Sequence, residues 1–331
     1  MRAAYIEETG PPDVIRVGDL PIPEPGPGQA LVRIRAVALN PFDLYIRAGT
    51  IKAPLTFPHV LACDFAGVVE KVGPGAARFE PGDRVWGSNQ GMLGRQGVAA
   101  EFAAIDDEWL HPTPALLPDP EAAAMAMVGI TAHLGLFHRA GLKQGEFVYV
   151  PGGAGGVGSM VVQMAKAAGA WVATSAGAPE RVELCERLGA DLAFNYKTDD
   201  PAARLREFAP DGIDVWYETQ RQPDLAVSVP LLRERGRMVL MAGRDATPAL
   251  PLGSFYTRDC SLLGFAMFNA SAEEQGRCAA EMVHWIEEGR LKPVVGRAFP
   301  LSAAADAERF LEANTIGKAG DLVGKVVVLV D

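Results

Sequence analysis

The residues with the clearest chemistry form the segment Gly153-Ala154-Gly155-Gly156-Val157-Gly158, which fits the pattern GxGxxG. A predicted strand, 146–151, precedes this segment and a predicted helix, 157–168, follows it, which is the context in which the pattern binds a dinucleotide. The glycines permit a tight turn and let the backbone approach a pyrophosphate, and the amino end of the helix offers N–H groups to its phosphates. The segment therefore predicts a dinucleotide site rather than a flexible connector.

The end of the next predicted strand, 171–175, indicates which nucleotide is bound. An NAD site usually places an acidic residue there, where it holds the ribose 2′-hydroxyl. Here the strand ends Thr174-Ser175-Ala176-Gly177 without an acid, and Arg181 follows in the next helix. A guanidinium binds a 2′-phosphate that a carboxylate would repel, so these residues predict NADPH. The alternative is that Arg181 is only a solvated helix residue.

The cysteines and histidines lack the spacings of a metal site. The four cysteines are far apart without a CxxC pair, which argues for a reducing compartment and against a disulfide framework or a four-cysteine zinc lobe. His133 and His138 are five positions apart on a predicted helix, so we expect them on different faces. We predict structural roles for all five histidines and core positions for three cysteines: His59, His111, His133, His138, His284, Cys63, Cys185 and Cys278.

Length and composition are typical of a globular protein of about two domains. The chain has 331 residues, of which 49% are apolar and 22% charged, so wholesale disorder is excluded. A net charge of −10 without a block of like charges is a poor match to nucleic acid or an anionic membrane. Glu7 and Glu8 stand where a signal peptide needs its apolar core, and the longest apolar stretch, 122–137, is too short to span a membrane. We therefore expect a cytoplasmic protein.

The order of predicted elements divides the chain in two. The first 120 or so residues are typical of strands and turns, such as the alternating strand 30–37, and end in the proline-rich segment 111–120. From about residue 145 strands alternate with helices, which predicts right-handed crossovers and a parallel sheet. Ser271 and Glu274 predict a capping box for a helix that runs to about residue 288. The apolar segment 325–330 predicts a buried strand that returns to the first domain. The predicted strands of the second part are 146–151, 171–175, 192–194, 213–217 and 238–241. The predicted helices are 157–168 and 179–188.

Six segments in order carry a resemblance to a known family. They are Asn40-Pro41-Phe42-Asp43-Leu44-Tyr45-Ile46-Arg47-Ala48-Gly49, Asp64-Phe65-Ala66-Gly67-Val68-Val69, Gly82-Asp83-Arg84-Val85, Gly129-Ile130-Thr131-Ala132, the glycine segment, and Gly324-Lys325-Val326. With them the chain resembles the medium-chain dehydrogenase/reductase superfamily, and most nearly its zinc-free quinone oxidoreductase, or zeta-crystallin-like, branch. The resemblance implies an α/β fold with an N-terminal, mostly-β GroES-like catalytic domain, 1–120, completed by about 290–331. It implies a doubly wound parallel-sheet Rossmann domain, 121–270, that binds NADPH.

The resemblance also bears on zinc. Zinc alcohol dehydrogenases of this superfamily place a cysteine where this chain has Asn40, and Gly-His-Glu where it has Ala62-Cys63-Asp64. Their last cysteine ligand has no counterpart near Val128. A catalytic zinc needs three protein ligands and an open position, so no metal is predicted. A mixed site from Cys63, Asp64 and a distant histidine remains the alternative.

The resemblance assigns roles residue by residue. Asn40, Asp43 and Tyr45 match the catalytic segment at the nicotinamide end. Tyr45 is the candidate for hydrogen bonding to the substrate oxygen or for donating a proton, because a phenol is protonated at neutral pH. The alternatives are that Tyr45 only packs against the cofactor, that water delivers the proton, and that Asn40 only braces the loop. Beyond the glycine segment, the residues expected along the dinucleotide are Thr131, Ser175, Gly177, Arg181, Tyr196, Gln222, Ala242, Gly243, Phe265, Met267 and Lys325.

These residues predict an NADPH-dependent, zinc-independent reductase of quinones or α,β-unsaturated carbonyl compounds. Such acceptors are already polarised, so the protein needs only to position them and to stabilise the developing oxyanion. One alternative is an enoyl-thioester reductase, whose wide basic mouth would use residues such as Arg47 and Lys52. Another is a non-catalytic NADPH-binding protein. The apolar segment 262–268 predicts a strand at a sheet edge that pairs with a second copy, giving a homodimer.

Overall fold

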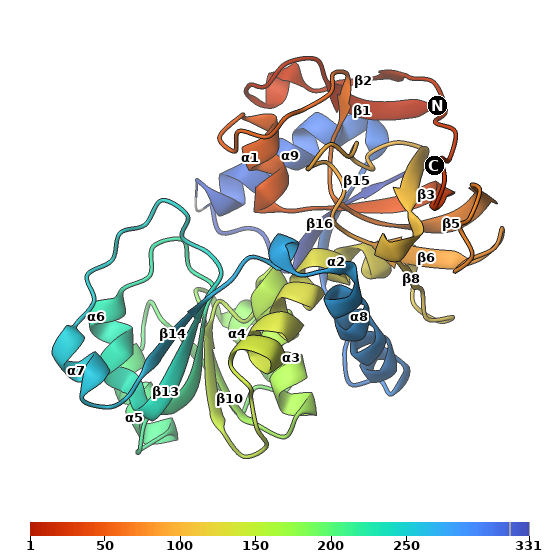
Figure 1. Ribbon diagram of the computed structural model, residues 1–331. Coiled ribbons are helices and arrows are strands. Elements are labelled where there is room, and N and C mark those ends of the chain that lie inside the picture. Colours follow the sequence, from red (N-terminus) through yellow and green to blue (C-terminus); the bar gives the residue numbers. More distant parts are fainter. Residues whose placement is uncertain (318, 331) are drawn as a thin grey trace. The chain divides into compact units, whose positions relative to one another are not determined.

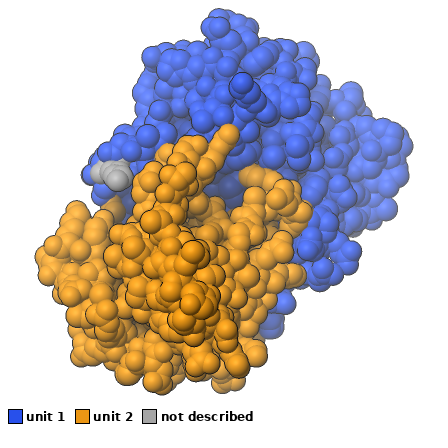
Figure 2. Space-filling view, turned by 60° about the vertical axis from the view of Figure 1, so that its left-hand side comes forward, with its two compact units in different colours: residues 1–127, 271–287, 293–331 blue, residues 128–270, 288–292 orange. Residues whose placement is uncertain are grey.

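The computed structural model describes residues 1–317 and 319–330, which form two compact units (Figure 2). Unit 1 consists of Met1–Met127, Ser271–Glu287 and Pro293–Asp331, and unit 2 of Val128–Ala270 and Glu288–Lys292. Ser271–Glu287, which the sequence analysis left between its two domains, belongs to unit 1. The chain therefore crosses between the units several times.

Unit 1 is built on two sheets (Figure 1). The smaller sheet has the order β2-β1-β4, and the larger has the order β15-β16-β3-β5-β6-β8, with β7 paired to β3. The strands of the two sheets are β1 (Arg2–Ile6), β2 (Arg16–Asp19), β4 (His59–Val60), β3 (Gln29–Leu39), β5 (Asp64–Val72), β6 (Arg84–Gly87), β7 (Phe102–Asp106), β8 (Leu110–Pro112), β15 (Val295–Pro300) and β16 (Lys325–Leu329). Short 3₁₀ turns lie at Pro12–Val14, Asp107–Trp109 and Leu301–Ala303.

The register of three neighbouring strands in the larger sheet fixes the positions of several polar residues. β16 pairs antiparallel with β3, with Val326 opposite Leu39, and β5 pairs with β3 with Asp64 opposite Ala38. The last residues of β3 and the first residues of β5 and β16 therefore lie at one end of the sheet. The predicted return of the terminal strand to the first part of the chain is confirmed.

Three helices belong entirely to unit 1: α1 (Pro41–Arg47), α8 (Ala272–Glu287) and α9 (Ala304–Thr315). The capping box predicted for α8 is present, because the backbone N–H of Glu274 donates to Ser271 Oγ at 3.2 Å and that of Ser271 to Glu274 Oε2 at 2.8 Å. α9 packs against α1 and against β15 and β16.

Unit 2 contains one six-stranded sheet of the doubly wound type, and helices cover both of its faces (Figure 1). The strand order is β11-β10-β9-β12-β13-β14 and every pair is parallel, as the alternation of strands and helices predicts. The chain reverses its direction of travel across the sheet between β9 and β12, and ligands bind at such a switch point outside the carboxyl ends of the strands.

The elements of unit 2 have the following bounds. The strands are β9 (Phe147–Pro151), β10 (Trp171–Ala176), β11 (Leu192–Asn195), β12 (Ile213–Glu218), β13 (Leu232–Leu240) and β14 (Ser261–Gly264). The helices are α3 (Gly156–Ala167), α4 (Pro179–Arg187), α5 (Pro201–Phe208), α6 (Leu225–Ser228) and α7 (Leu252–Tyr256), with 3₁₀ turns at Val229–Leu231 and Met267–Asn269.

Two strand predictions in unit 2 are wrong in extent. β13 begins at Leu232 rather than at 238. Its residues Arg233, Glu234 and Arg235 are charged and exposed, so the sequence there has no apolar alternation that would predict a strand. The apolar segment 262–268 is not one strand, since β14 ends at Gly264 and a 3₁₀ turn begins at Met267. β14 nevertheless lies at the edge of the sheet, as expected.

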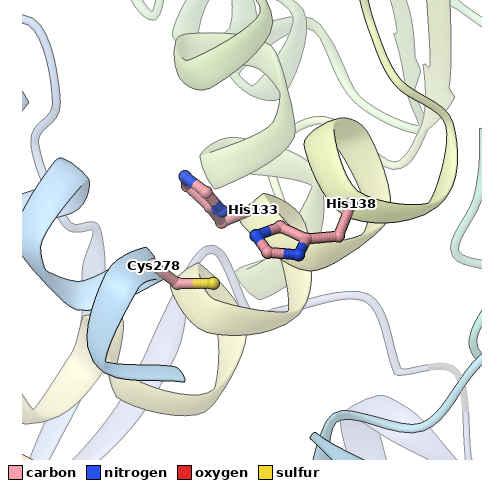
Figure 3. Close-up of side chains that lie close together, drawn as sticks. All are labelled: His133, His138 and Cys278. Carbon is pink, nitrogen blue, oxygen red and sulfur yellow. The ribbon is translucent and has the colours of Figure 1, made fainter. Parts of the chain in front are cut away.

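Helix α2 (Asp119–His133) continues into a π-helical turn, Leu134–Arg139. Together, Asp119–Arg139 is long and apolar enough to cross a membrane, but 78% of its apolar window is buried inside the protein, as in a core helix. The π turn corrects the prediction for His133 and His138, whose rings lie 5.9 Å apart (Figure 3). A turn closed by i→i+5 hydrogen bonds brings residues five apart onto one face. Cys278, the third side chain drawn there, belongs to α8 of unit 1.

Candidate active site

The loop between β9 and α3 is built for close approach of a ligand. The N–H groups of Gly152 and Gly153 donate to the carbonyl of Ser175, and the N–H of Gly155 donates to the carbonyl of Gly152. Gly152 has a φ of +73°, which favours glycine. Gly155 is the N-cap of α3 and no side chain caps the helix, so the first-turn N–H groups face outward for an anion.

Two glycines, Gly153 in this loop and Gly158 in the first turn of α3, leave no room for a side chain. A Cβ on Gly158 would overlap the carbonyl oxygen of Gly152 and lie 2.8 Å from the carbonyl carbon, and one on Gly153 would lie 2.9 Å from Thr174 Cγ2. The glycines therefore let the helix, the loop and the neighbouring strand pack closely. Together with the uncapped helix end, this geometry fits the pyrophosphate of a dinucleotide.

The residues predicted for the adenosine end gather at the carboxyl ends of β10 and β11. Gly177 follows β10 and Tyr196 follows β11, and a Cβ on Gly177 would lie 2.6 Å from the Tyr196 hydroxyl. Tyr196 is 51% exposed, and Arg181 lies half-buried in the first turns of α4. The exposed phenol of Tyr196, the guanidinium of Arg181 and the backbone of Gly177, which has no side chain, suit a ribose that carries a 2′-phosphate.

Ser175 has a different place from the one predicted. Its hydroxyl is buried within the sheet and lies 2.8 Å from the Tyr149 hydroxyl, so it does not face a ligand. Burial raises the pKa of Tyr149, so that this phenol stays protonated. Ser175 contributes through its carbonyl, which holds the glycine loop.

The remaining residues predicted along the dinucleotide follow the carboxyl ends of β12, β13 and β14. Gly243 has a φ of +81°, and the loops after β12 and β13 approach closely there, since a Cβ on Gly243 would lie 3.1 Å from the carbonyl oxygen of Arg221. Thr131 lies buried in α2, where its carbonyl accepts a hydrogen bond from Tyr217. The others lie as follows: Gln222 after β12, Ala242 after β13, and Phe265 and Met267 after β14.

Unit 1 contains a buried polar network at the end of β3, β5 and β16. Asn40 Nδ2 donates to Asp64 Oδ2 at 2.8 Å, and the Lys325 ammonium donates to Asn40 Oδ1. The ammonium also lies 3.8 Å from Asp64 Oδ2, and the Ser88 hydroxyl donates to Asp64 Oδ1 at 2.6 Å. The carboxamide of Asn40 is thus fixed between a cation and an anion.

Asp43 is the second buried carboxyl of this network. The backbone N–H of Asn40 donates to its Oδ2 at 2.7 Å, which caps the amino end of α1. Burial and the nearby Asp64 charge raise the pKa of Asp43 to about 7, against the hydrogen bonds from Asn40 and Cys63. Burial also raises the pKa of Asp64, which Lys325, Ser88 and Asn40 oppose.

Cys63 is buried, as expected of a core residue, but it is also part of the polar network. Its thiol donates to Asp43, and burial with the two neighbouring carboxylates raises the pKa of this thiol well above its usual range. Cys63 therefore acts here as a protonated donor to Asp43. Cys185 and Cys278 are fully buried, which confirms their core positions.

The three predicted catalytic residues do not point the same way. Asn40 and Asp43 belong to the buried network, whereas Tyr45 lies two positions after Asp43 on α1 and is half-buried. Residues two apart on a helix do not share a face, so Tyr45 is directed away from the carboxyls. Lys325, predicted as a cofactor ligand, lies with Asn40 and Asp64 instead.

Sequence reasoning did not predict the network as a unit. Asp64 was considered only within a family segment and as a ligand of the alternative mixed metal site, and Ser88 was not singled out as a site residue. The one local signal is an acidic residue at the start of a buried apolar strand, Asp64 in β5, because such a charge needs partners.

Arg47 is unavailable to a ligand. It is 1% exposed, lies 2.6 Å from Glu308 and 2.7 Å from Glu312, and donates to the carbonyl of Gly10. These contacts tie α1 to α9 and to the N-terminal loop. Arg47 therefore cannot line the basic mouth that an enoyl-thioester reductase would need, while Lys52 is exposed.

Comparison with known proteins places the chain in a family. Residues 26–115 match the alcohol dehydrogenase GroES-like domain, and residues 156–287 match the zinc-binding dehydrogenase model. A quinone oxidoreductase of Rattus norvegicus is 33% identical over 98% of this chain and 97% of its own. The chain belongs to the quinone oxidoreductases of the medium-chain dehydrogenase/reductase superfamily. An NADPH-dependent alkenal/one oxidoreductase of Arabidopsis thaliana is 33% identical over 99% of this chain and 79% of its own.

Solved structures of the family share the fold over the full length. One described as an NAD-dependent alcohol dehydrogenase has a TM-score of 0.90 at 32% identity and covers both chains completely. A mycobacterial protein complexed with NADPH has a TM-score of 0.84 at 31% identity, with 99% of each chain covered. Relatives of this fold thus include proteins described with either nicotinamide nucleotide.

The zinc of the family model's description does not suit the residues present. Asn40 offers an amide where a thiolate would be needed, and the Cys63 thiol is hydrogen-bonded to Asp43. The Lys325 ammonium between Asn40 and Asp64 would repel a divalent cation. The network therefore carries no step through a metal.

Proposed function

We propose that this protein is an NADPH-dependent, zinc-independent reductase that transfers a hydride to quinones or α,β-unsaturated carbonyl compounds. The observation that carries the proposal is the glycine loop with the uncapped end of α3 at the carboxyl ends of a doubly wound sheet. The full-length similarity to a quinone oxidoreductase and to an alkenal/one oxidoreductase supports the acceptor classes. The free cysteines support a cytoplasmic location.

The residues of this chain divide the work as follows. The glycine loop and α3 hold the pyrophosphate, and Arg181 with Tyr196 hold the 2′-phosphate ribose. NADPH, when bound, supplies the hydride. Tyr45 hydrogen-bonds the acceptor oxygen as negative charge develops there and supplies a proton to it. The network of Asn40, Asp43, Asp64 and Lys325 fixes the amino end of α1, which carries Tyr45.

The test is NADPH oxidation by the purified protein with three acceptor panels: quinones, alkenals and enones, and enoyl thioesters. Turnover with the first two supports the proposal. Turnover confined to enoyl thioesters would favour that alternative, and tight NADPH binding without turnover on any panel would indicate a non-catalytic binding protein.

We predict that Arg181→Ala weakens NADPH binding selectively. Losing a charge-assisted contact to phosphate costs on the order of 1.5–3 kcal/mol, a roughly 10- to 150-fold rise in Kd. NADH, which lacks the 2′-phosphate, should bind as before. Fluorescence titration of both nucleotides measures this, with Arg187→Ala, exposed at the other end of α4, as the control. Equal weakening of both nucleotides would contradict the assignment.

We predict that activity is independent of zinc. Metal analysis of purified protein should give well under one zinc per chain, and a chelator should leave turnover intact, because three zinc ligands are not assembled at Asn40, Cys63 and Asp64. Stoichiometric zinc whose removal stops turnover would refute this. Its loss in Cys63→Ser would then locate the metal.

We also propose a homodimer formed through β14. This strand ends the sheet of unit 2 and offers half-buried leucines, Leu262 and Leu263, with unpaired backbone groups on its outer side. Pairing with a two-fold related copy would satisfy this edge. Light scattering should give about twice the chain mass of 35.2 kDa, and Leu263→Asp should shift the protein toward monomer. A monomer at micromolar concentration in the unaltered protein would rule the pairing out.

A further inference from the structure

The side chain of Lys325 ends inside unit 1. Its ammonium donates to Asn40 Oδ1, lies 3.8 Å from Asp64 Oδ2, and is 6% exposed. Burial lowers the pKa of Lys325, and the carboxylates of Asp64 and Asp43 oppose this. A buried ammonium persists only when it is paired, so Lys325 is held inside unit 1 by Asn40 and Asp64.

Two carboxyls share this one cation. Asp64 accepts from Asn40 Nδ2, from the Ser88 hydroxyl and from the backbone N–H of Met127 at 3.2 Å, so its ionised form is well supported. Asp43 accepts the backbone N–H of Asn40 and the thiol of Cys63, and no cation among the described residues is in hydrogen-bond contact with it. If one of the two carboxyls carries a proton, Asp43 holds it more easily than Asp64.

The charged and titratable groups that face Asp43 come from several elements. They are Asp64 at the start of β5, Cys63 just before it, Lys325 at the start of β16 and Glu308 on α9. Glu308, whose pKa burial raises to about 8, is paired with Arg47 of α1. Lys325 is therefore a cation that acts on both carboxyls of the network.

We propose that Lys325 is a positioning residue: as the counter-ion of Asp64 and Asp43, it keeps Asp64 ionised, aligns the Asn40 carboxamide and so fixes the amino end of α1. The inference rests on the proposed function only for the role of α1, which carries Tyr45. Lys325 then acts through Asn40 and α1 at the acceptor end of the site, and is not a ligand of the cofactor.

The first test reads the carboxyl groups directly, without nucleotide or acceptor. Infrared titration of aspartate-labelled protein should show one protonated carboxyl that ionises near pH 7, the pKa that burial and Asp64 give Asp43. In Lys325→Met this ionisation should move to higher pH, because an opposite charge has been removed. Lys325→Arg should stay near the unaltered protein, and Asp43→Asn should lose the signal. Lys71→Met, which removes an exposed lysine of β5, is the control.

The second test separates positioning from cofactor binding. Lys325→Met should lower kcat by about tenfold or more while the NADPH Kd changes less than twofold, and Lys325→Arg should recover most of the kcat. A tenfold rise in NADPH Kd, or an unchanged carboxyl titration, overturns the proposal. Lys325→Gln, which keeps a donor toward Asn40, serves if Lys325→Met does not fold, with the same predicted titration. Absence of any turnover in the unaltered protein would sink the proposed function and leave the titration result standing.

Discussion

Replacing Gly158 with alanine should raise the Kd for NADPH roughly 5- to 150-fold. The new Cβ would overlap the carbonyl oxygen of Gly152 and lie 2.8 Å from its carbon and 3.0 Å from Gly153 Cα. These atoms are backbone and cannot swing aside as a flexible side chain would, so α3 must move away from the loop. Such overpacking typically costs about 1–3 kcal/mol, and here the loss falls on the N–H groups that face the pyrophosphate. Fluorescence titration with NADPH measures the change.

A matched control lies in the same unit. Gly253 sits in α7, and a Cβ there meets nothing within 4 Å. Gly253→Ala should leave the NADPH Kd unchanged and raise the thermal midpoint slightly, because alanine favours a helix over glycine. If Gly158→Ala, correctly folded by circular dichroism, binds NADPH as tightly as the unaltered protein, the loop is not the pyrophosphate site.

The cofactor half of the molecule could be predicted from the sequence because its signals are local. The glycine segment, the strand before it and the helix after it occupy about 23 consecutive positions, and each has its own pattern. The alternation of strands and helices then limits the topology to a parallel sheet with right-handed crossovers. The local sequence does not predict the environment of Ser175. Only the pairing of β9 with β10 shows that its hydroxyl faces Tyr149.

The buried network could not be predicted in this way because its members are distant in sequence. Asn40 and Lys325 are 285 positions apart, and they meet because β3 pairs with β16 in one particular register. A shift of one residue would turn every side chain of β16 to the other face. Cys63 was predicted as a core residue from its type, and its bond to Asp43 becomes apparent only when α1 is placed beside β5.

Local geometry and burial account for two further errors. His133 and His138 were assigned to different faces on the assumption of a regular α-helix, and the π turn after α2 removes that assumption. Arg47 has the residue type of a phosphate ligand, but its partners Glu308 and Glu312 lie on a helix more than 250 positions later. Long-range ion pairs of this kind decide whether a basic residue reaches solvent.

The choice between NADPH and NADH depends on few atoms, and the family includes relatives described with each. The fold does not distinguish the two nucleotides, since both structures superpose over the full chain. We expect the residue set after β10 and β11, which includes Gly177, Arg181 and Tyr196, to distinguish them. The Arg181→Ala comparison therefore tests specificity separately from the family assignment.

Tyr45→Phe should lower turnover by roughly 10- to 1,000-fold, the range spanned by general acids and oxyanion donors. The ring remains to pack, so the NADPH Kd should change little. The effect should be larger for an α,β-unsaturated ketone than for a quinone, because a reduced quinone is the more stable anion and needs less help from a donor. Steady-state kinetics with both acceptors measure this, and Tyr256→Phe, 69% exposed on α7, is the control.

The position of Tyr45 on α1 makes this prediction specific. Asp43, two residues earlier, faces the buried network, so a loss of turnover in Tyr45→Phe cannot be attributed to the carboxyl pair as long as the titration of Asp43 is unchanged. Loss of turnover with an altered carboxyl titration would instead mean that the substitution has moved α1. If Tyr45→Phe reduces both acceptors at the rate of the unaltered protein, Tyr45 is only a wall of the pocket, and the proton must come from water.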